Sequence, residues 1–429
     1  MGDVFPVILM FATLFVLMAI RTPIAFALLA SSFGPILIEE RLSLLIVAQR
    51  TYNSLDTFLL LAVPFFLLAG SLMNETGITV RLIRFAAALV GHLRGGLAQI
   101  NVVVSMMFAG ISGSSLADVA GAGTILIPAM RDRGFPVAFS VAITATSSVM
   151  GVLIPPSLLL IVWGAVTGTS IGALFIGGIV PGVVLGLSLM IAVYVIARRR
   201  SFPVEERRDR SEIVSSLKDA ILALFMPVVV VGGIRLGWFT PTEASIIAVL
   251  YALALGLVVY RSVAIRRLPT IFFNAAKLVS TSMFCVGSAG VFGFLLAYYR
   301  VPQLLAELAG GFSSPALLLI AISCLLLVLG TFLDGLVIAI ICGPLFLPAV
   351  TNLGVHPVHY GLVSCMAIAI GVVTPPYGLC LLMAASIGKI PVASAFPDTF
   401  RLIGAMLAAL LLVILVPAIT VGLVQVFGP

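Results

Sequence analysis

The chain has 429 residues and a net charge of +7; 62% of its residues are hydrophobic and only 9% are charged. Soluble domains carry about 25% charged residues, so this composition excludes a soluble globular fold. Apolar runs of about 20 residues recur without polar alternation, which excludes a lipid-facing β-barrel. The sequence therefore predicts an all-α polytopic protein embedded in a lipid bilayer. Its basic residues lie in short loops, as in the cytoplasmic loops of membrane proteins, and do not indicate binding to nucleic acid.

The first half of the chain, residues 1–197, contains apolar runs that predict five membrane crossings. They lie near residues 4–20, 24–46, 55–73, 137–166 and 172–197. The segment at about 95–131 is too rich in glycine to be one crossing, and it predicts a re-entrant hairpin. The crossing at about 137–166 carries GVLIPPS at residues 151–157, where two prolines predict a broken helix. Because the N-terminus is acidic and the first basic residue is Arg21, we expect an external N-terminus and no cleaved signal peptide.

The middle segment, residues 198–218, is strongly charged and predicts a cytoplasmic linker between two halves of nearly equal length. The second half, residues 219–429, again predicts five crossings and one hairpin. The crossings lie near residues 219–236, 242–260, 269–298, 358–388 and 399–427, and the hairpin lies at about 304–350. The crossing at about 358–388 carries GVVTPPY at residues 371–377 and is predicted to be a second broken helix.

The two halves are related by an internal repeat. Three residues of the first break recur 220 positions later: Gly151, Pro155 and Pro156 correspond to Gly371, Pro375 and Pro376. Because five crossings per half is an odd number, the second copy is expected to lie upside down relative to the first. This topology places both termini outside and most basic residues in the cytoplasm, with Arg300 as the exception. Inverted repeats with helices broken at corresponding places indicate a secondary transporter whose site lies near the bilayer midplane.

The four breaks carry the residues expected to form this site. The hairpins contain GISGSSLADVAGAG at 110–123 and LGTFLDGL at 329–336. Unpaired backbone persists in lipid only where it lines a cavity or binds a ligand. Hydroxyl oxygens beside freed backbone carbonyls offer the all-oxygen cage that a small hard cation needs, and sodium (Na+) is the natural candidate. The positive N-terminal ends of the half-helices suit a carboxylate substrate.

The candidate substrate-binding residues are those at the breaks: Ser115, Asp118, Pro155, Pro156, Asp334, Pro375 and Pro376. Structural roles compete with this interpretation. A Pro-Pro pair can form only a kink, serines can bond back to their own helix, and each of the two aspartates can cap a returning half-helix. For Glu243, at the end of the stretch TPTE, we favour a structural capping box with Thr240.

Other classes of protein lack support in the sequence. The five cysteines lie in apolar segments without a CxxC pair, so we expect neither a metal site nor a disulfide. No HExxH motif or P-loop occurs, and we expect no enzymatic activity and no ATP-driven transport by this chain. An ion channel would need a continuous polar pore, whereas the polar residues here gather at four breaks.

Seven stretches carry a resemblance to a known family. They are RTPIAFALL (21–29), PFFLLAGSLMNETGIT (64–79), GHLRGGLAQINVVVSMMFAGISGSSLADVA (91–120), GVLIPPS (151–157), FTPTEAS (239–245), FLDGLVIAIICGPLFLPA (332–349) and GVVTPPYG (371–378). Together they resemble the large, DctM-type membrane subunit of tripartite ATP-independent periplasmic (TRAP) transporters over essentially the full length. The combination of GISGSSxAD with two PP motifs is the specific part of this signature.

The resemblance implies an elevator-type fold similar to that of divalent-anion/sodium symporters. A transport domain of two hairpins and two broken helices would slide past a scaffold. The implied function is sodium-coupled import of a carboxylate solute, such as a C4-dicarboxylate or a sugar acid, across the inner membrane of a bacterium or archaeon. The implied partners are a periplasmic substrate-binding protein and a small four-helix membrane subunit of the DctQ type, here a separate chain. A self-sufficient sodium/dicarboxylate symporter of the same fold is the alternative.

The resemblance also implies two sets of sodium ligands, each of which pairs one hairpin tip with one broken helix. The first set is Ser112, Ser114, Ser115 and Gly151, and the second is Gly330, Thr331, Gly371 and Thr374.

Overall fold

The computed structural model describes residues 4–20, 22–39, 42–200, 202–204, 208–309, 311–312 and 314–427. Within these ranges every regular element is a helix, which confirms the expected all-α class. Arg21, which served to orient the first crossing, lies outside the described residues, as do residues 201 and 205–207 of the predicted linker.

The first half begins with α1 (Val4–Ala19), α2 (Ile24–Ile38), α3 (Leu45–Leu55), η1 (Phe58–Leu61), α4 (Ala62–Glu75) and α5 (Ile78–Val90). The predicted hairpin consists of α6 (Gly96–Ser112) and α7 (Ser115–Asp132). The predicted broken helix consists of α8 (Val137–Ser147), α9 (Met150–Leu153) and α10 (Leu158–Thr167), and α11 (Ile171–Arg200) follows it. The break falls at residues 154–157, and the two parts of the helix are bent by 42°.

The second half follows the same order. It begins with α12 (Arg210–Arg235), α13 (Pro241–Ala254), η2 (Leu255–Val259), η3 (Ile265–Arg267), α14 (Leu268–Tyr298) and α15 (Val301–Ala309). The hairpin consists of α16 (Pro315–Gly330) and α17 (Gly335–Asn352), and the broken helix consists of α18 (Pro357–Gly371) and α19 (Leu379–Gly388). The half ends with η4 (Val392–Ala395), α20 (Phe396–Leu415) and α21 (Ala418–Phe427). The inverted orientation of this second copy stays a prediction.

Seven helices of the described residues are long and apolar enough to cross a membrane, or eight if the bent pair counts as one span. Six of the seven coincide with predicted crossings: 58–75, 171–200, 210–235, 241–259, 265–298 and 392–415. The seventh, α17, is the returning half of the second hairpin. The chain is therefore a multi-pass membrane protein, while the total of ten crossings stays a prediction.

The predicted linker at 198–218 is shorter in the structure, because helices enter it from both sides. α11 continues to Arg200, and α12 begins at Arg210. The Asp209 side chain caps α12 by accepting a hydrogen bond from the Arg210 N–H at 2.7 Å. Arginine, lysine and glutamate are good helix formers, so the charged residues end the apolar part of each helix without ending the helix itself.

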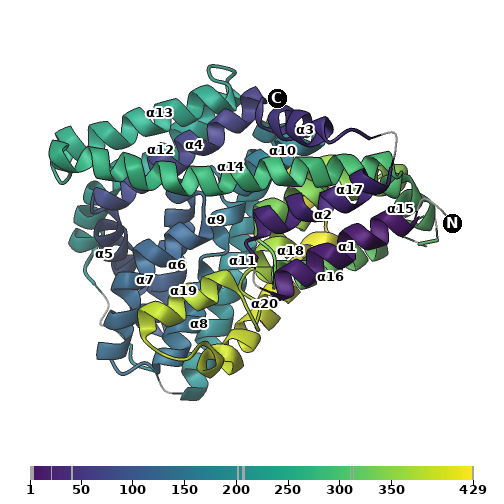
Figure 1. Cartoon of the computed structure of the whole chain (residues 1–429). Coiled ribbons are helices and arrows are strands. Elements are labelled where there is room, and N and C mark those ends of the chain that lie inside the picture. The colour runs from purple at the N-terminus through teal and green to yellow at the C-terminus, as the bar shows by residue number, and fades with distance from the viewer. Residues whose placement is uncertain are drawn as a thin grey trace.

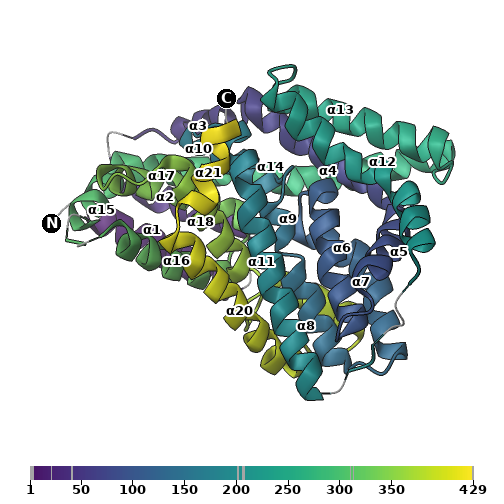
Figure 2. The ribbon, with the colours of Figure 1, turned by 180° about the vertical axis from the view of Figure 1, so that it is seen from behind.

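One group of helices packs around α14, which runs across the whole molecule in Figure 1. α14 contacts α2, α3 and α4, while α13 packs on α4 and α12, and α1 packs on α2. We call α1–α4 and α12–α14 the framework helices. On the opposite side, Figure 2 shows α11 near the centre with α20 beside it, and these two helices pack on each other.

The hairpins and broken helices form a second group, in which the two halves of the chain interlock. α10, from the first broken helix, packs on α17 of the second hairpin. α19, from the second broken helix, packs on α7 and α8 of the first half. Because each broken helix packs on the hairpin of the other half, the two hairpin tips lie close together. Sliding of this group past the framework helices stays a prediction.

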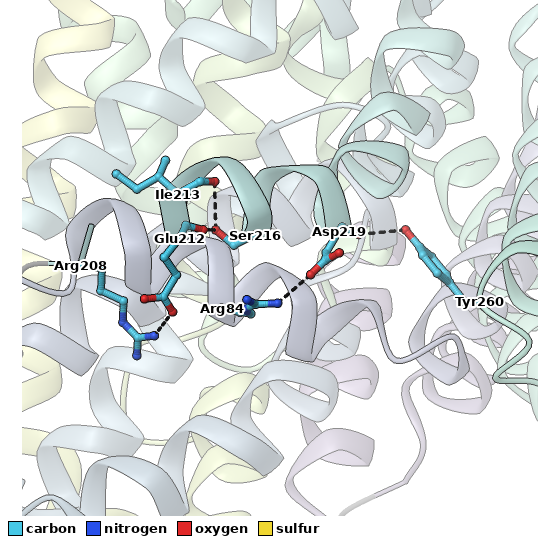
Figure 3. A network of polar contacts seen from close by, with 7 residues as sticks. All are labelled: Arg84, Arg208, Glu212, Ile213, Ser216, Asp219 and Tyr260. Carbon is cyan, nitrogen blue, oxygen red and sulfur yellow. Dashed lines mark hydrogen bonds and ion pairs between the residues drawn. The ribbon is translucent and has the colours of Figure 1, made fainter. Parts of the chain in front are cut away.

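α5 connects the two groups, since it packs on α12 and on α6. Figure 3 shows how charge joins it to α12: the Arg84 guanidinium pairs with the Asp219 carboxylate at 2.7 Å. The Tyr260 hydroxyl donates to the Asp219 carbonyl oxygen at 3.2 Å. The Arg81 guanidinium lies 3.9 Å from the centre of the Tyr260 ring. These side chains are partly exposed, so each contact alone contributes little to stability. Together the contacts fix the orientation of α5.

The start of α13 confirms the predicted capping box. The Thr240 hydroxyl accepts a hydrogen bond from the Glu243 N–H at 3.3 Å, and the Glu243 carboxylate accepts one from the Thr240 N–H at 2.7 Å. The Glu243 carboxylate therefore pairs with a free backbone N–H group at the start of α13.

Candidate functional site

The tip of the first hairpin packs directly on the first broken helix. Gly113 turns the chain between α6 and α7 with φ +61°, and its carbonyl oxygen accepts a hydrogen bond from the Leu158 N–H at 3.2 Å. A Cβ at Gly113 would lie 2.6 Å from the carbonyl oxygen of Pro156. Glycine is therefore required here both by its backbone conformation and by the close approach of the break.

The first predicted set of sodium ligands is brought together by this contact. A Cβ at Gly151 would lie 3.2 Å from the carbonyl carbon of Ser114 and 3.3 Å from the backbone nitrogen of Ser115. The Ser112 hydroxyl reaches the same turn, where it is 3.4 Å from both the nitrogen and the carbonyl oxygen of Ser114. At this length the bonds are weak, so these oxygens remain able to bind a cation.

The second predicted set comes together in the same way. A Cβ at Gly330 would lie 2.8 Å from the Cα of Gly371, and the reverse distance is also 2.8 Å. The hydroxyls of Thr331 and Thr374 each donate to their own helix, to the carbonyls of Val328 and Ile370, both at 2.7 Å. A hydroxyl that donates its proton keeps two lone pairs, so both threonine oxygens can still face a cation.

A cavity of about 320 Å³ lies between the two tips. Its lining includes Ser114 and Ser115 from the first tip, Asp334 from the second, and Leu158 and Cys380 from the two broken helices. The N-termini of four helices therefore meet at one cavity: α7 begins at Ser115, α10 at Leu158, α17 at Gly335 and α19 at Leu379.

The backbone N–H groups at this cavity can bind an anion, while the Asp334 carboxylate adds a negative charge to the lining. Each helix N-terminus carries the equivalent of about half a positive charge, together with N–H groups that have no partner inside the helix. No lysine, arginine or histidine is among the described residues that line the cavity. The carboxyl ends of α6, α9, α16 and α18 lie at the same breaks and present carbonyl oxygens. One cavity thus combines donors for an anion with acceptors for cations.

The predicted substrate residues divide into two groups. Ser115 and Asp334 line the cavity, and Asp334 also caps α17, because its Oδ1 accepts a hydrogen bond from the Leu336 N–H at 2.9 Å. The remaining five, Asp118 and the prolines 155, 156, 375 and 376, do not line it. The two Pro-Pro peptide bonds are cis and form the breaks themselves. Asp118 is buried behind the first tip with 1% of its surface exposed.

Several cavity residues were not predicted from the sequence. Leu278 and Ser282 come from α14 and Leu67 comes from α4, so framework helices close one side of the cavity. The Ser282 hydroxyl donates to the Leu278 carbonyl oxygen, as an ordinary serine in a membrane helix does. No local signal distinguishes this serine from its neighbours Ser280 and Thr281, which also bond back to their own helix. Cys380, which also lines the cavity, is a buried thiol.

A second cavity of about 320 Å³ lies between α14 and α17. Its lining is dominated by apolar residues, including Gly290, Gly293, Ile341 and Leu345, and its polar members are Ser54 and Thr57. None of the helix breaks opens into it. It therefore lacks the converging N–H groups that distinguish the first cavity.

Comparison with known proteins agrees with these features. The model of the family described as "Tripartite ATP-independent periplasmic transporter, DctM component" matches residues 11–419. A sialic acid TRAP transporter large permease protein, SiaM of Vibrio cholerae, is 37% identical over 406 residues, or 94% of this chain and 95% of that protein. A C4-dicarboxylate TRAP transporter large permease protein, DctM of Pseudomonas aeruginosa, is 37% identical over 383 residues, or 89% of this chain and 90% of that protein.

Among solved structures, the Neisseria gonorrhoeae efflux pump MtrF has a similar fold. Its TM-score is 0.60 at 13% identity, and the match covers 87% of this chain and 84% of that one. The likeness concerns the fold alone. The family model and the relatives at 37% identity cover nearly the whole chain, including all four breaks. The chain therefore belongs to the DctM family, the large permease component of tripartite ATP-independent periplasmic transporters.

Proposed function

We propose that this chain imports a small organic acid across the bacterial inner membrane together with sodium ions, by an elevator movement of the hairpin group. The observation that carries the proposal is the convergence of four helix N-termini on one cavity beside four helix C-termini. The relatives named above carry sialic acid and C4-dicarboxylates in their names, and both are carboxylic acids. A carboxylate is among the anions that helix N-termini bind.

The geometry of the two tips supports separate roles for the ion ligands and the helix N-termini. Ser112, Ser114, Ser115 and Gly151 would hold one sodium ion at the first tip, and Gly330, Thr331, Gly371 and Thr374 would hold another at the second. Each ion would tie a hairpin tip to the break that faces it and so complete the wall of the cavity. The solute carboxylate would then accept hydrogen bonds from the N–H groups of the four helix starts. A cavity that lacks its ions or its solute would carry unpaired polar groups through an apolar barrier, which is unfavourable.

The family is tripartite, so a periplasmic binding protein and a small membrane subunit complete the transporter. We propose that the small subunit is a separate chain and that the binding protein delivers the solute. Solute movement would then use the sodium gradient and no nucleotide.

Uptake into proteoliposomes tests this proposal. The large and small subunits are reconstituted and supplied with a radiolabelled acid, with and without the binding protein, in a sodium or a choline gradient. We expect uptake only with the binding protein and the sodium gradient together. Sodium-dependent uptake without the binding protein would support the self-sufficient symporter instead. Equal uptake in choline would exclude sodium coupling.

Replacing Thr374 by alanine is expected to raise the sodium concentration for half-maximal uptake about tenfold, the loss typical of a weakened metal site. Thr351→Ala is the matched control, because its hydroxyl also donates to its own helix, to the Leu347 carbonyl at 2.8 Å, but lies far along α17 from the tip. The sodium dependence of uptake by both variants checks this. An equal response of the two variants would remove Thr374 from the proposed ion site.

A further inference from the structure

Asp118 is a buried acid that the transport site described above does not use. It lies in the first turn of α7, and 1% of its surface is exposed. Its two carboxylate oxygens are buried, and neither has a partner that meets ordinary hydrogen-bond geometry. The Ser105 hydroxyl of α6 faces the carboxylate closely enough to interact with it. None of the ion pairs formed by the described residues includes Asp118.

A carboxylate in this position must be neutralised by a proton or by a bound cation. An ionised group that is buried without a partner is strongly unfavourable. Acids inside the membrane are therefore rare, and those that occur have a functional role. The N-terminus of α7 supplies the equivalent of only about half a charge. The nearest basic residue on the same helix, Arg131, lies at its other end and pairs with Asp132.

Polar side chains from three helices continue inward from Asp118. We call Asn101, Ser105, Asp118, Thr144 and Ser147 the buried polar cluster; each is at most 1% exposed. The hydroxyl oxygens of Ser105 and Ser147 are 2.9 Å apart, and the Ser147 hydroxyl donates to the side-chain amide oxygen of Asn101 at 3.2 Å. The Asn101 amide donates to the Thr144 hydroxyl at 2.6 Å.

The protons of this cluster are too few to satisfy Asp118. The Ser105 hydroxyl has one proton, which it can donate either to Asp118 or to Ser147. At most one proton therefore reaches the carboxylate, whose two oxygens can accept about four bonds. The cluster is rich in oxygen acceptors and poor in donors, as expected for a site that binds a cation.

We propose that Asp118 and Ser105 bind a further sodium ion inside the hairpin group, behind the first tip. The ligands are all hard oxygens, and the single carboxylate matches the charge of a monovalent ion. Ser105 and Ser112 are about two turns apart on α6, roughly 10 Å along the axis, so one ion cannot contact both. The site is therefore separate from the pair of ion sites at the tips.

The position of this ion gives it a role in solute binding. Cys380 lines the cavity and lies within electrostatic range of both Asp118 and Asp334. An ion at Asp118 neutralises a negative charge close to the place where the anionic solute binds. Removal of the ion leaves that charge uncompensated and weakens solute binding, so the site links sodium to the solute without touching the solute.

Equilibrium binding of ²²Na+ to the purified complex of large and small subunits tests the proposal. We expect Asp118→Asn to bind one sodium ion fewer per large subunit than the unchanged protein. Asp132→Asn is the matched control: it removes an exposed carboxylate at the other end of α7 and should leave the number of ions unchanged. Ser105→Ala keeps the charge and loses one ligand, so we expect full stoichiometry with about tenfold weaker binding of the affected ion.

Thermal unfolding in choline and in sodium buffer separates this role from a purely structural one. Without sodium, Asp118→Asn should melt at or above the temperature of the unchanged protein, because it removes an unpaired buried charge, and sodium should stabilise it less. Full sodium stoichiometry in Asp118→Asn would overturn the proposal. If that variant does not fold, unchanged sodium affinity in Ser105→Ala overturns it. The inference rests on the proposed sodium coupling, but the failures differ: absence of ²²Na+ binding by the unchanged protein contradicts the coupling itself.

Discussion

Replacing Pro155 and Pro156 together by alanine is expected to abolish sodium-driven uptake while the protein still reaches the membrane. The prolines supply no N–H groups and hold the chain open between Leu153, where α9 ends, and Leu158, where α10 begins. Alanine restores the donors and favours continuation of the helix, which would pair the carbonyl oxygens now facing the first tip. Uptake by proteoliposomes and the yield of folded protein check the two parts of the prediction.

Pro181→Ala provides the control for this double variant. Pro181 lies inside α11, which continues as a helix on both sides of it, so its loss should leave uptake near the original rate. Normal sodium-driven uptake by the double variant would show that the break at 154–157 is a kink without a role in transport.

Replacing Gly371 by alanine should reduce uptake to background by separating the second tip from its break. The added Cβ would lie 2.8 Å from the Cα of Gly330 and 2.8 Å from the carbonyl oxygen of Leu327. Both contacts are to backbone, so two helices must move apart. Overpacking of this kind costs about 1–3 kcal/mol in the free energy of unfolding. Chemical denaturation and the sodium dependence of uptake measure the two effects.

Gly404→Ala is the corresponding control. Gly404 lies inside α20, and a Cβ there would meet no atom within 4 Å. We expect unchanged uptake and a gain of about 0.5–1 kcal/mol in the free energy of unfolding, because alanine favours the helix. If Gly371→Ala retains uptake with normal sodium dependence, the close contact of the second tip is not needed for the ion site.

The breaks of the helices could be predicted from the sequence because their causes are local. A proline pair ends a helix wherever it stands, and glycine, serine and aspartate mark hairpin tips by their own preferences. The predicted breaks at 151–157 and 371–377 therefore agree closely with the ends of α9 and α18. The internal repeat of the two halves then indicated that the breaks at 151–157 and 371–377 belong to one site.

The short helices α3 and α5 were missed because hydropathy identifies only apolar spans. α5 carries Arg81 and Arg84 on one face and buries Leu82 and Phe85 on the other, so its average composition resembles that of a loop. The boundaries of the linker were misplaced for the same reason. Periodicity rather than mean hydropathy is the signal that finds such helices.

Distances across the fold could not be predicted from the sequence. Ser115 and Asp118 were both predicted to bind the substrate because they lie at the tip of the first hairpin. In the structure Ser115 lines the cavity, whereas Asp118 is directed towards Ser105 on the neighbouring helix α6. Likewise, the packing of α10 on α17 and of α19 on α7 joins segments far apart in the chain, and only the folded structure reveals it.

The structure of the complex of large and small subunits, determined by electron cryo-microscopy with sodium and a transported acid, would show where the acid binds and whether its binding needs sodium. We expect density for the acid in the cavity between the tips, with its carboxylate against the N-termini of α7, α10, α17 and α19. The density should vanish when choline replaces sodium. Density for the acid in the cavity between α14 and α17 would contradict the proposed binding site, and equal occupancy without sodium would contradict sodium coupling.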